Sequence, residues 1–163
     1  MGFNISGIVI NQNFKDHLEQ LSGCLKLELV PREEITFEEA SQNWKREGCD
    51  IYFSEKGTLL FLPMDMCNRK RSCENLEIMT FVYSEMSMVF YMNYSNGSQD
   101  REIAEVEGAR NLEDGPELDI EADAGGEVSE IIIRMISKIL GEDFWDIDLS
   151  GKALRCNCKP LPC

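Results

Sequence analysis

The chain has 163 residues, of which 43% are hydrophobic and 28% charged, a composition typical of a globular protein. Its 16 basic and 30 acidic residues give a net charge of −14, which disfavours nucleic-acid and anionic-membrane binding and favours a basic partner. Because no basic leader with a long apolar stretch and no apolar run of about 20 residues is visible, we expect a cytoplasmic protein without membrane spans.

The first third of the chain alternates strand and helix patterns. The predicted elements are a strand at 3–10, a helix from Asn13 to 22–23, a strand at 24–30 and a helix from Thr36 to Gly48. Asn13 is a favourable N-cap residue. Thr36 and Glu39 form a capping-box pattern, in which each side chain satisfies an unpaired backbone amide. The apolar face of this second helix is expected to include Phe37 and Trp44.

Hairpin patterns dominate the middle of the chain. The predicted strands are 50–54, 58–64, 76–83, 86–94 and 100–108. The second of them contains four successive apolar residues, 59–62, so we expect a central strand that is covered on both faces. Alternation predicts that every second residue from Met86 to Tyr94 shares a core face. By the same period, Val106 is expected to face the core and Arg101 to face solvent.

The last third mixes helical and extended patterns. We expect a short strand at 118–121, a helix at 127–140, a strand or extended arm at 144–149 and an irregular tail at 156–163. The helix carries a wide apolar stripe that must lie against a large partner, which the sheet would supply. In 144–149, alternation predicts that Trp145 and Ile147 dock while Asp146 and Asp148 face water.

These elements predict an α+β fold. Its sheet should be mainly antiparallel and built from hairpins, with about three helices packed mostly on one face. We expect residues 1–155 to form one domain, followed by the cysteine- and proline-containing tail at 156–163.

The residues needed by common catalytic sites are sparse. His17 is the only histidine, and its position in the first predicted helix favours a surface role. No phosphate-binding loop, dinucleotide fingerprint, zinc-protease motif or nucleophile elbow is present. We therefore expect no cofactor, and an enzyme only if its site is unfamiliar.

The seven cysteines leave two interpretations. In a reducing cytosol they are expected to be free thiols, with Cys24 and Cys49 in or near the core. The alternative is a structural metal site, which needs four soft ligands. Its candidate ligands are Cys67, Cys73, Cys156, Cys158 and Cys163.

The stretch from Ser84 to Glu121 carries a resemblance. It reads S-E-M-S-M at 84–88, then Gly97, Arg101 and Gly108, then G-P-E-L-D-I-E at 115–121. This pattern resembles a hairpin in small acidic bacterial proteins of the polymorphic-toxin immunity type. The resemblance, over about a quarter of the chain, implies an acidic, cytosolic α+β protein that binds a cognate toxin rather than catalyses.

Together these observations favour an acidic protein-binding module, and the resemblance implies an immunity-type neutraliser of a basic partner. The residues expected to contact the partner are Glu102, Glu105, Glu107, Glu113 and Asp114. Two alternatives stay open, namely a small-ligand-binding protein or enzyme with an unfamiliar site, and a module stabilised by a cysteine-bound metal.

Overall fold

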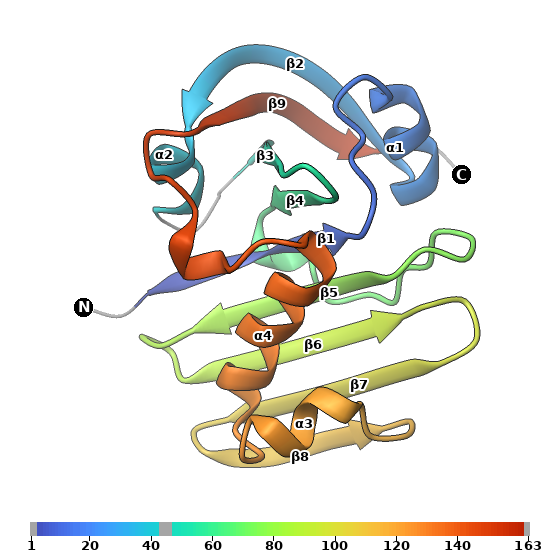
Figure 1. Cartoon of the computed structure of the whole chain (residues 1–163), viewed down its shortest axis with the longest axis vertical. Coiled ribbons are helices and arrows are strands. Elements are labelled where there is room, and N and C mark those ends of the chain that lie inside the picture. The colour runs from blue at the N-terminus through green and yellow to red at the C-terminus, as the bar shows by residue number, and fades with distance from the viewer. Residues whose placement is uncertain (1–2, 43–46, 162–163) are drawn as a thin grey trace.

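A computed structural model describes residues 3–42 and 47–161 as an α+β fold built on one large sheet (Figure 1). In this part of the chain nine strands lie in the order β2-β9-β3-β4-β1-β5-β6-β7-β8. The strands are β1 (Asn4–Ile10), β2 (Leu27–Thr36), β3 (Cys49–Phe53), β4 (Thr58–Phe61), β5 (Ile78–Ser84), β6 (Val89–Ser95), β7 (Asp100–Val106), β8 (Ala109–Asp114) and β9 (Lys152–Pro160). All pairings between neighbouring strands are antiparallel, as the hairpin patterns predict.

Four α-helices and two 3-10 turns complete the described residues. They are α1 (Leu18–Leu25), α2 (Phe37–Ser41), α3 (Asp119–Asp123), α4 (Val128–Leu140), η1 (Met64–Met66) and η2 (Phe144–Asp146). The capping box that starts α2 is confirmed, because the Glu39 amide donates to the Thr36 hydroxyl at 3.1 Å and the Thr36 amide donates to the Glu39 carboxylate at 3.4 Å. Trp44, which was expected on this helix, lies outside the described residues.

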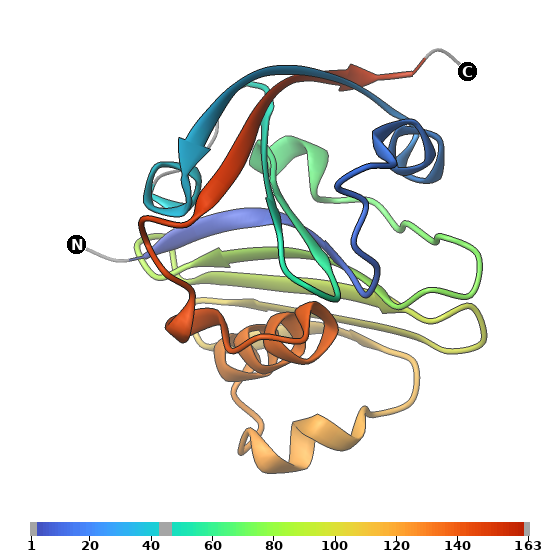
Figure 2. The ribbon, with the colours of Figure 1, turned by 45° about the horizontal axis from the view of Figure 1, so that its top comes forward.

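The sheet has a hydrophobic core on each face. Ile5 and Val9 of β1 join the core that contains α4, whereas Ile8 joins the opposite core. All four residues of β4 are buried, so the prediction of a strand covered on both faces is confirmed. Figure 2 shows α3 and α4 on one side of the central strands and α1 on the other, beside β2 and β9. Helices therefore cover both faces, and their number exceeds the expected three.

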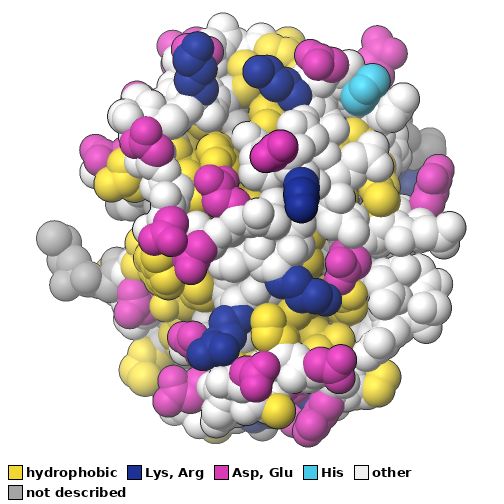
Figure 3. Space-filling model, in the orientation of Figure 1, with side chains coloured by type: hydrophobic (Ala, Val, Ile, Leu, Met, Phe, Trp, Pro, Cys, Tyr) yellow, Lys and Arg dark blue, Asp and Glu magenta, His cyan; other side chains and the backbone are white. Residues whose placement is uncertain are grey.

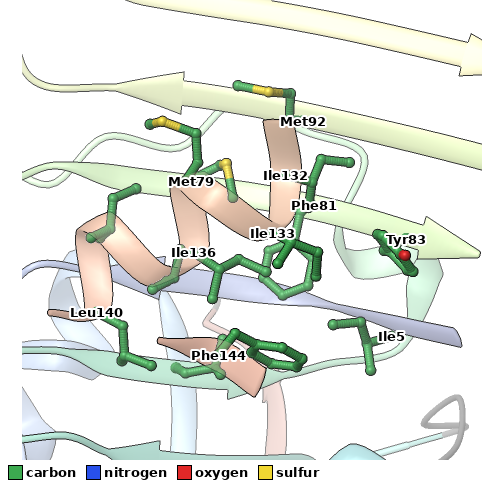
Figure 4. Packing of buried hydrophobic residues seen from close by; sticks show 14 of the residues in the cluster. Ile5, Met79, Phe81, Tyr83, Met92, Ile132, Ile133, Ile136, Leu140 and Phe144 are labelled. Carbon is green, nitrogen blue, oxygen red and sulfur yellow. The ribbon is translucent and has the colours of Figure 1, made fainter. Parts of the chain in front are cut away.

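Helix α4 is the main cover of one face. It lies across β1, β5 and β6, and Ile132 and Ile136 pack toward Met79 and Phe81 (Figure 4). Complete burial of one aliphatic side chain contributes about 1.5–3 kcal/mol, so this stripe anchors the layer. The helix ends at Gly141, whose left-handed φ of 77° lets its amide donate to the Ser137 carbonyl.

The strand predicted at 86–94 begins later than its alternation suggests. Met88 has a φ of 53°, which ends the extended conformation, and β6 starts at Val89. Phe90 still packs against the α4 core. Met86 and Met88 lie in the preceding turn and are 66% and 50% exposed, so the expectation that they face the core is wrong.

The first helix and the 144–149 segment also differ from expectation. Helix α1 follows His17 rather than Asn13, whose side-chain oxygen instead accepts from the Lys15 amide at 2.8 Å in a local turn. Residues 144–146 form η2, which breaks the two-residue alternation. Trp145 is consequently 59% exposed, contrary to prediction, whereas Ile147 is buried.

The tail predicted to be irregular is a strand as far as Pro160. Strand β9 lies between β2 and β3, and Cys156 sits directly opposite Cys49 of β3. Alternation predicted only the first part of its partner β2, because the strand expected at 24–30 in fact begins at Leu27 and continues past Pro31 to Thr36. The local sequence of β9 holds cysteine and proline in place of an apolar alternation. The expectation for residues 156–160 is therefore wrong, because pairing with two distant strands decides their conformation.

Candidate partner-binding site

The five predicted contact residues all lie on the hairpin formed by β7 and β8, at one end of the sheet. Every residue of β8 is exposed, and β8 pairs with β7 alone within the described chain. Its outer edge therefore presents backbone amide and carbonyl groups that no strand satisfies. Acidic side chains are spread over the face seen in Figure 3, including the end that carries α3 and β8.

Glu102 and Asp114 are brought together on one face of the hairpin. They are direct register partners, and such pairs have Cβ atoms about 4.5–5.5 Å apart. Because Ile103 points into the α4 core, Glu102 points to the opposite face, where its carboxylate accepts a 2.6 Å hydrogen bond from the Tyr91 hydroxyl. Two adjacent carboxylates repel one another, so this position favours a cationic group from a partner.

Glu105 and Glu107 lie near the tip. Glu105 is opposite Arg110, beside a register shift between β7 and β8. Glu107 is exposed in the two-residue turn with a φ of 51°, and Gly108 follows with a φ of 83°. Positive φ at both turn positions is the geometry that a tight hairpin needs. No ion pair of either carboxylate occurs among the described residues, so both can meet a partner.

Glu113 is already neutralised within the protein. Its carboxylate contacts Arg110 at 3.0 Å and Arg101 at 3.1 Å. Hydrogen bonds from Arg110 and then from Arg101 hold the pKa of Glu113 below its usual value. Glu113 was predicted to contact a partner, but in the structure it links the two strands of the hairpin.

The network under the hairpin was missed from the sequence. Arg101 was expected to face solvent, yet its side chain is only 1% exposed. Its Nε and Nη2 atoms donate to the two carboxylate oxygens of Glu121 at 2.9 and 2.7 Å, and Nη1 donates to the Gly115 carbonyl at 2.8 Å. A buried bidentate pair of this kind fixes geometry because both groups stay hydrogen-bonded.

The prediction of a strand at 118–121 is wrong. These residues enter α3, and the Glu121 carboxylate accepts from the Leu118 amide at 2.8 Å, which caps the helix start. Glu121 is thus shared between Arg101 and the first turn of α3. The signal available in the sequence was the position of Arg101, two residues before the buried Ile103 and therefore on the same inward face.

The cysteines form a second chemical feature, on the opposite part of the sheet. Cys24 and Cys73 form a disulfide, so the expectation that all the cysteines are free thiols is wrong for this pair. The described residues contain no group of three or more His, Cys, Asp or Glu side chains that could hold a metal ion. Of the metal candidates, Cys67, Cys156 and Cys158 are free thiols, and Cys163 lies outside the described residues.

Two surface hollows are relevant to ligand binding. The larger, about 580 Å³, is lined by the Cys24–Cys73 disulfide and by Gln12 and Phe14. The other, about 470 Å³, holds Glu77 at its wall. The Glu77 carboxylate accepts from the Tyr94 hydroxyl at 2.6 Å and from the Lys138 ammonium at 3.1 Å.

Comparisons with known proteins identify no relative. No protein-family profile, curated protein or solved structure matches the chain. Within residues 3–42 and 47–161, no helix combines the length and apolar character needed to span a membrane.

Proposed function

We propose that the protein is an acidic binding module that holds a basic protein partner at the β7–β8 end of its sheet, in the manner of an immunity protein. The observation that carries the proposal is the coincidence of an open sheet edge with acidic side chains that have no ion pair in the described part of the chain. Strand β8 is exposed throughout, and Glu105, Glu107 and Asp114 stand on the same hairpin.

The open edge suggests how the partner is held. An extended segment can add to β8 as a further strand, and main-chain hydrogen bonds then supply affinity. The flanking carboxylates supply charge complementarity, which raises the association rate for a basic segment and rejects an acidic one. The Arg101–Glu121 pair keeps β7, β8 and α3 in a fixed arrangement before the partner arrives.

The test begins with a tagged full-length protein, which retains partners from a native lysate at low salt and releases them along a salt gradient. The recovered basic protein is then measured against a Glu107→Lys/Asp114→Lys variant. We expect the association rate at low salt to fall by about tenfold or more. Amide hydrogen exchange in β8 should slow when the partner binds.

The matched control is Glu19→Lys/Glu55→Lys, which changes two exposed acids away from the hairpin. Each substitution adds two charges, so both double variants move the net charge from −14 to −10. An equal loss of binding in the control would show that overall charge, rather than the hairpin, attracts the partner. Unchanged exchange in β8 would exclude strand addition.

A second candidate function is binding of a small cationic ligand in the hollow beside Glu77. Glu117, Asp119 and Asp123 join Glu77 and Tyr94 in its lining. Lys138 also lines the hollow and is paired with Glu77, so a polyamine would meet the three remaining carboxylates. Isothermal titration with spermidine checks this candidate. Saturable binding that Glu117→Gln/Asp119→Asn weakens would favour it, and the absence of binding heat would exclude it.

A further inference from the structure

Six of the seven cysteines gather in the core on the face opposite α4. They are Cys24, Cys49, Cys67, Cys73, Cys156 and Cys158. Only one pair of them is joined, the Cys24–Cys73 disulfide between α1 and the loop that precedes β5. The remaining four are free thiols, and they differ in access and in their neighbours.

Three of the free thiols lie on one face of two neighbouring strands. Cys49 begins β3, and Cys156 of β9 is its direct register partner. Cys158 is two residues further along β9 and so points to the same face. Cys49 and Cys158 are therefore diagonal neighbours across the β3–β9 pair, close enough for each thiol to shift the pKa of the other.

Access distinguishes the two members of this pair. Cys49 is buried, with 2% of its surface exposed. Cys158 is partly exposed and lines a surface hollow of about 220 Å³, together with Glu28 and Lys159. A small oxidant can therefore reach Cys158 from solvent, whereas it cannot reach Cys49 directly.

The environment also separates their reactivity. The hydrogen bond from Cys49 lowers the pKa of Cys158, and the nearby Arg71 guanidinium adds to this effect, against the opposing influence of burial. Burial raises the pKa of Cys49. The same cause raises the pKa of Cys156 to about 11 and that of Cys67 to about 12. Since the thiolate is the reactive form, Cys158 is the thiol best suited to attack.

We propose that Cys158 and Cys49 are a redox-modification site, in which Cys158 is oxidised first and Cys49 then closes a second disulfide between β9 and β3. The oxidant is a low-molecular-weight disulfide such as oxidised glutathione. This inference rests on the thiol pair alone and does not depend on the proposed binding function.

The reaction consists of two thiol–disulfide exchanges. The Cys158 thiolate attacks one sulfur of oxidised glutathione, the glutathione S–S bond breaks, and one glutathione leaves as thiolate. Cys49 then loses its proton to solvent, and its sulfur attacks the Cys158 sulfur of the mixed disulfide. The second glutathione leaves as thiolate, so the two protein thiols lose two electrons and oxidised glutathione becomes two molecules of reduced glutathione.

The experiment equilibrates the full chain in glutathione buffers from reducing to oxidising, quenches it with acid and N-ethylmaleimide, and maps linked peptides by mass spectrometry. We expect a peptide pair joined through Cys49 and Cys158 to appear as the buffer becomes oxidising. In Cys49→Ser, we expect Cys158 to retain glutathione as a mixed disulfide. The matched control Cys156→Ser should still form the Cys49–Cys158 link.

A second measurement needs no variant. In the wild-type protein under mildly reducing conditions, N-ethylmaleimide should label Cys158 at least about tenfold faster than Cys67. Equal labelling rates would overturn the assignment of Cys158 as the first thiol to react. The disulfide itself would be refuted if no buffer gave the Cys49–Cys158 link, or if Cys49 paired with Cys156 instead.

Discussion

The two ends of the sheet hold their outer elements in place with different chemistry. At the end formed by β2, β9 and β3, cysteines pack among aliphatic residues of the core and a disulfide joins α1 to a loop. At the β7–β8 end, a buried arginine–glutamate pair holds the last hairpin against α3. Both β2 and β8 are edge strands, but β2 packs against α1 and α2, whereas every residue of β8 is exposed. A disulfide suits a permanent scaffold, and a hydrogen-bonded ion pair beneath an open edge is compatible with the partner binding that we propose for this end.

The largest expected effect comes from breaking the ion pair at the acidic end. Arg101→Ala leaves the Glu121 carboxylate, which is 6% exposed, buried without its cation. We expect the free energy of unfolding to fall by about 3–5 kcal/mol, as measured by urea denaturation. The control is Arg110→Ala, which removes a partly exposed pair to Glu113 and should cost less than about 1 kcal/mol. Equal losses would mean that burial of Arg101 does not distinguish the two pairs.

The next effect tests the sulfur-rich end. The Cys24–Cys73 disulfide spans a sequence separation of 49 residues, so the Cys24→Ser/Cys73→Ser variant should lose about 2–4 kcal/mol of stability through the freer unfolded chain. Adding dithiothreitol to the wild-type protein should produce a similar loss and leave the variant unchanged. Stability that is insensitive to both changes would show that packing alone holds α1. Because disulfides persist in oxidising compartments, measuring the oxidation state in cells would also test the predicted cytoplasmic location.

A smaller, pH-dependent effect is expected where α4 meets the sheet. Burial alone would raise the pKa of Glu77, but hydrogen bonds from Tyr94 and then Lys138 outweigh it and lower the pKa below its usual value. A lowered carboxyl pKa contributes stability above the unfolded-state pKa, and this contribution is lost as pH falls through the folded-state pKa. Glu77→Gln should therefore cost about 1 kcal/mol near pH 7, and much less in acid. Thermal unfolding across pH measures this difference, and a loss independent of pH would refute the ionic role of Glu77.

The smallest effect sets the baseline for surface charges. Arg134 pairs with Glu130 at 2.9 Å one turn apart on the exposed side of α4. Arg134→Gln should lower stability by no more than about 0.5 kcal/mol. Urea denaturation measures this loss in the free energy of unfolding. A loss above about 1 kcal/mol would mean that the pair contributes more than an ordinary surface ion pair.

The sequence predicts elements whose determinants are local. The capping box at Thr36, the apolar stripe of 128–140 and the two-sided burial of β4 each depend on residues near one another in the chain, and all are present. Strand β9 escaped prediction because its conformation depends on β2 and β3, which precede it by a long stretch. The burial of Arg101 was not predicted because a charged side chain is expected at the surface unless a buried partner is known.

Only part of the candidate site was predictable from the sequence. Alternation predicted Glu105 and Glu107 as outward-facing residues of a strand at 100–108, but it predicted no strand at 109–114, so β8 was missed. It could not separate Glu113, which is engaged by two arginines, from Glu107, which has no ion pair in the described chain. The Cys24–Cys73 disulfide has no local signature either, since only the fold brings the two positions to a Cα separation of 5.4 Å.

The position of β9 has a consequence for biosynthesis. Strand β2 pairs with β9 alone among the described strands. During synthesis, β2 therefore has no strand partner until residues 152–160 have been made. At about 5–20 residues per second, the nascent chain spends several seconds with β2 and one side of β3 unsatisfied. During that interval the exposed backbone edges of β2 and β3 can pair with strands of other chains. Chaperone binding to residues 27–36 would protect the nascent protein from aggregation.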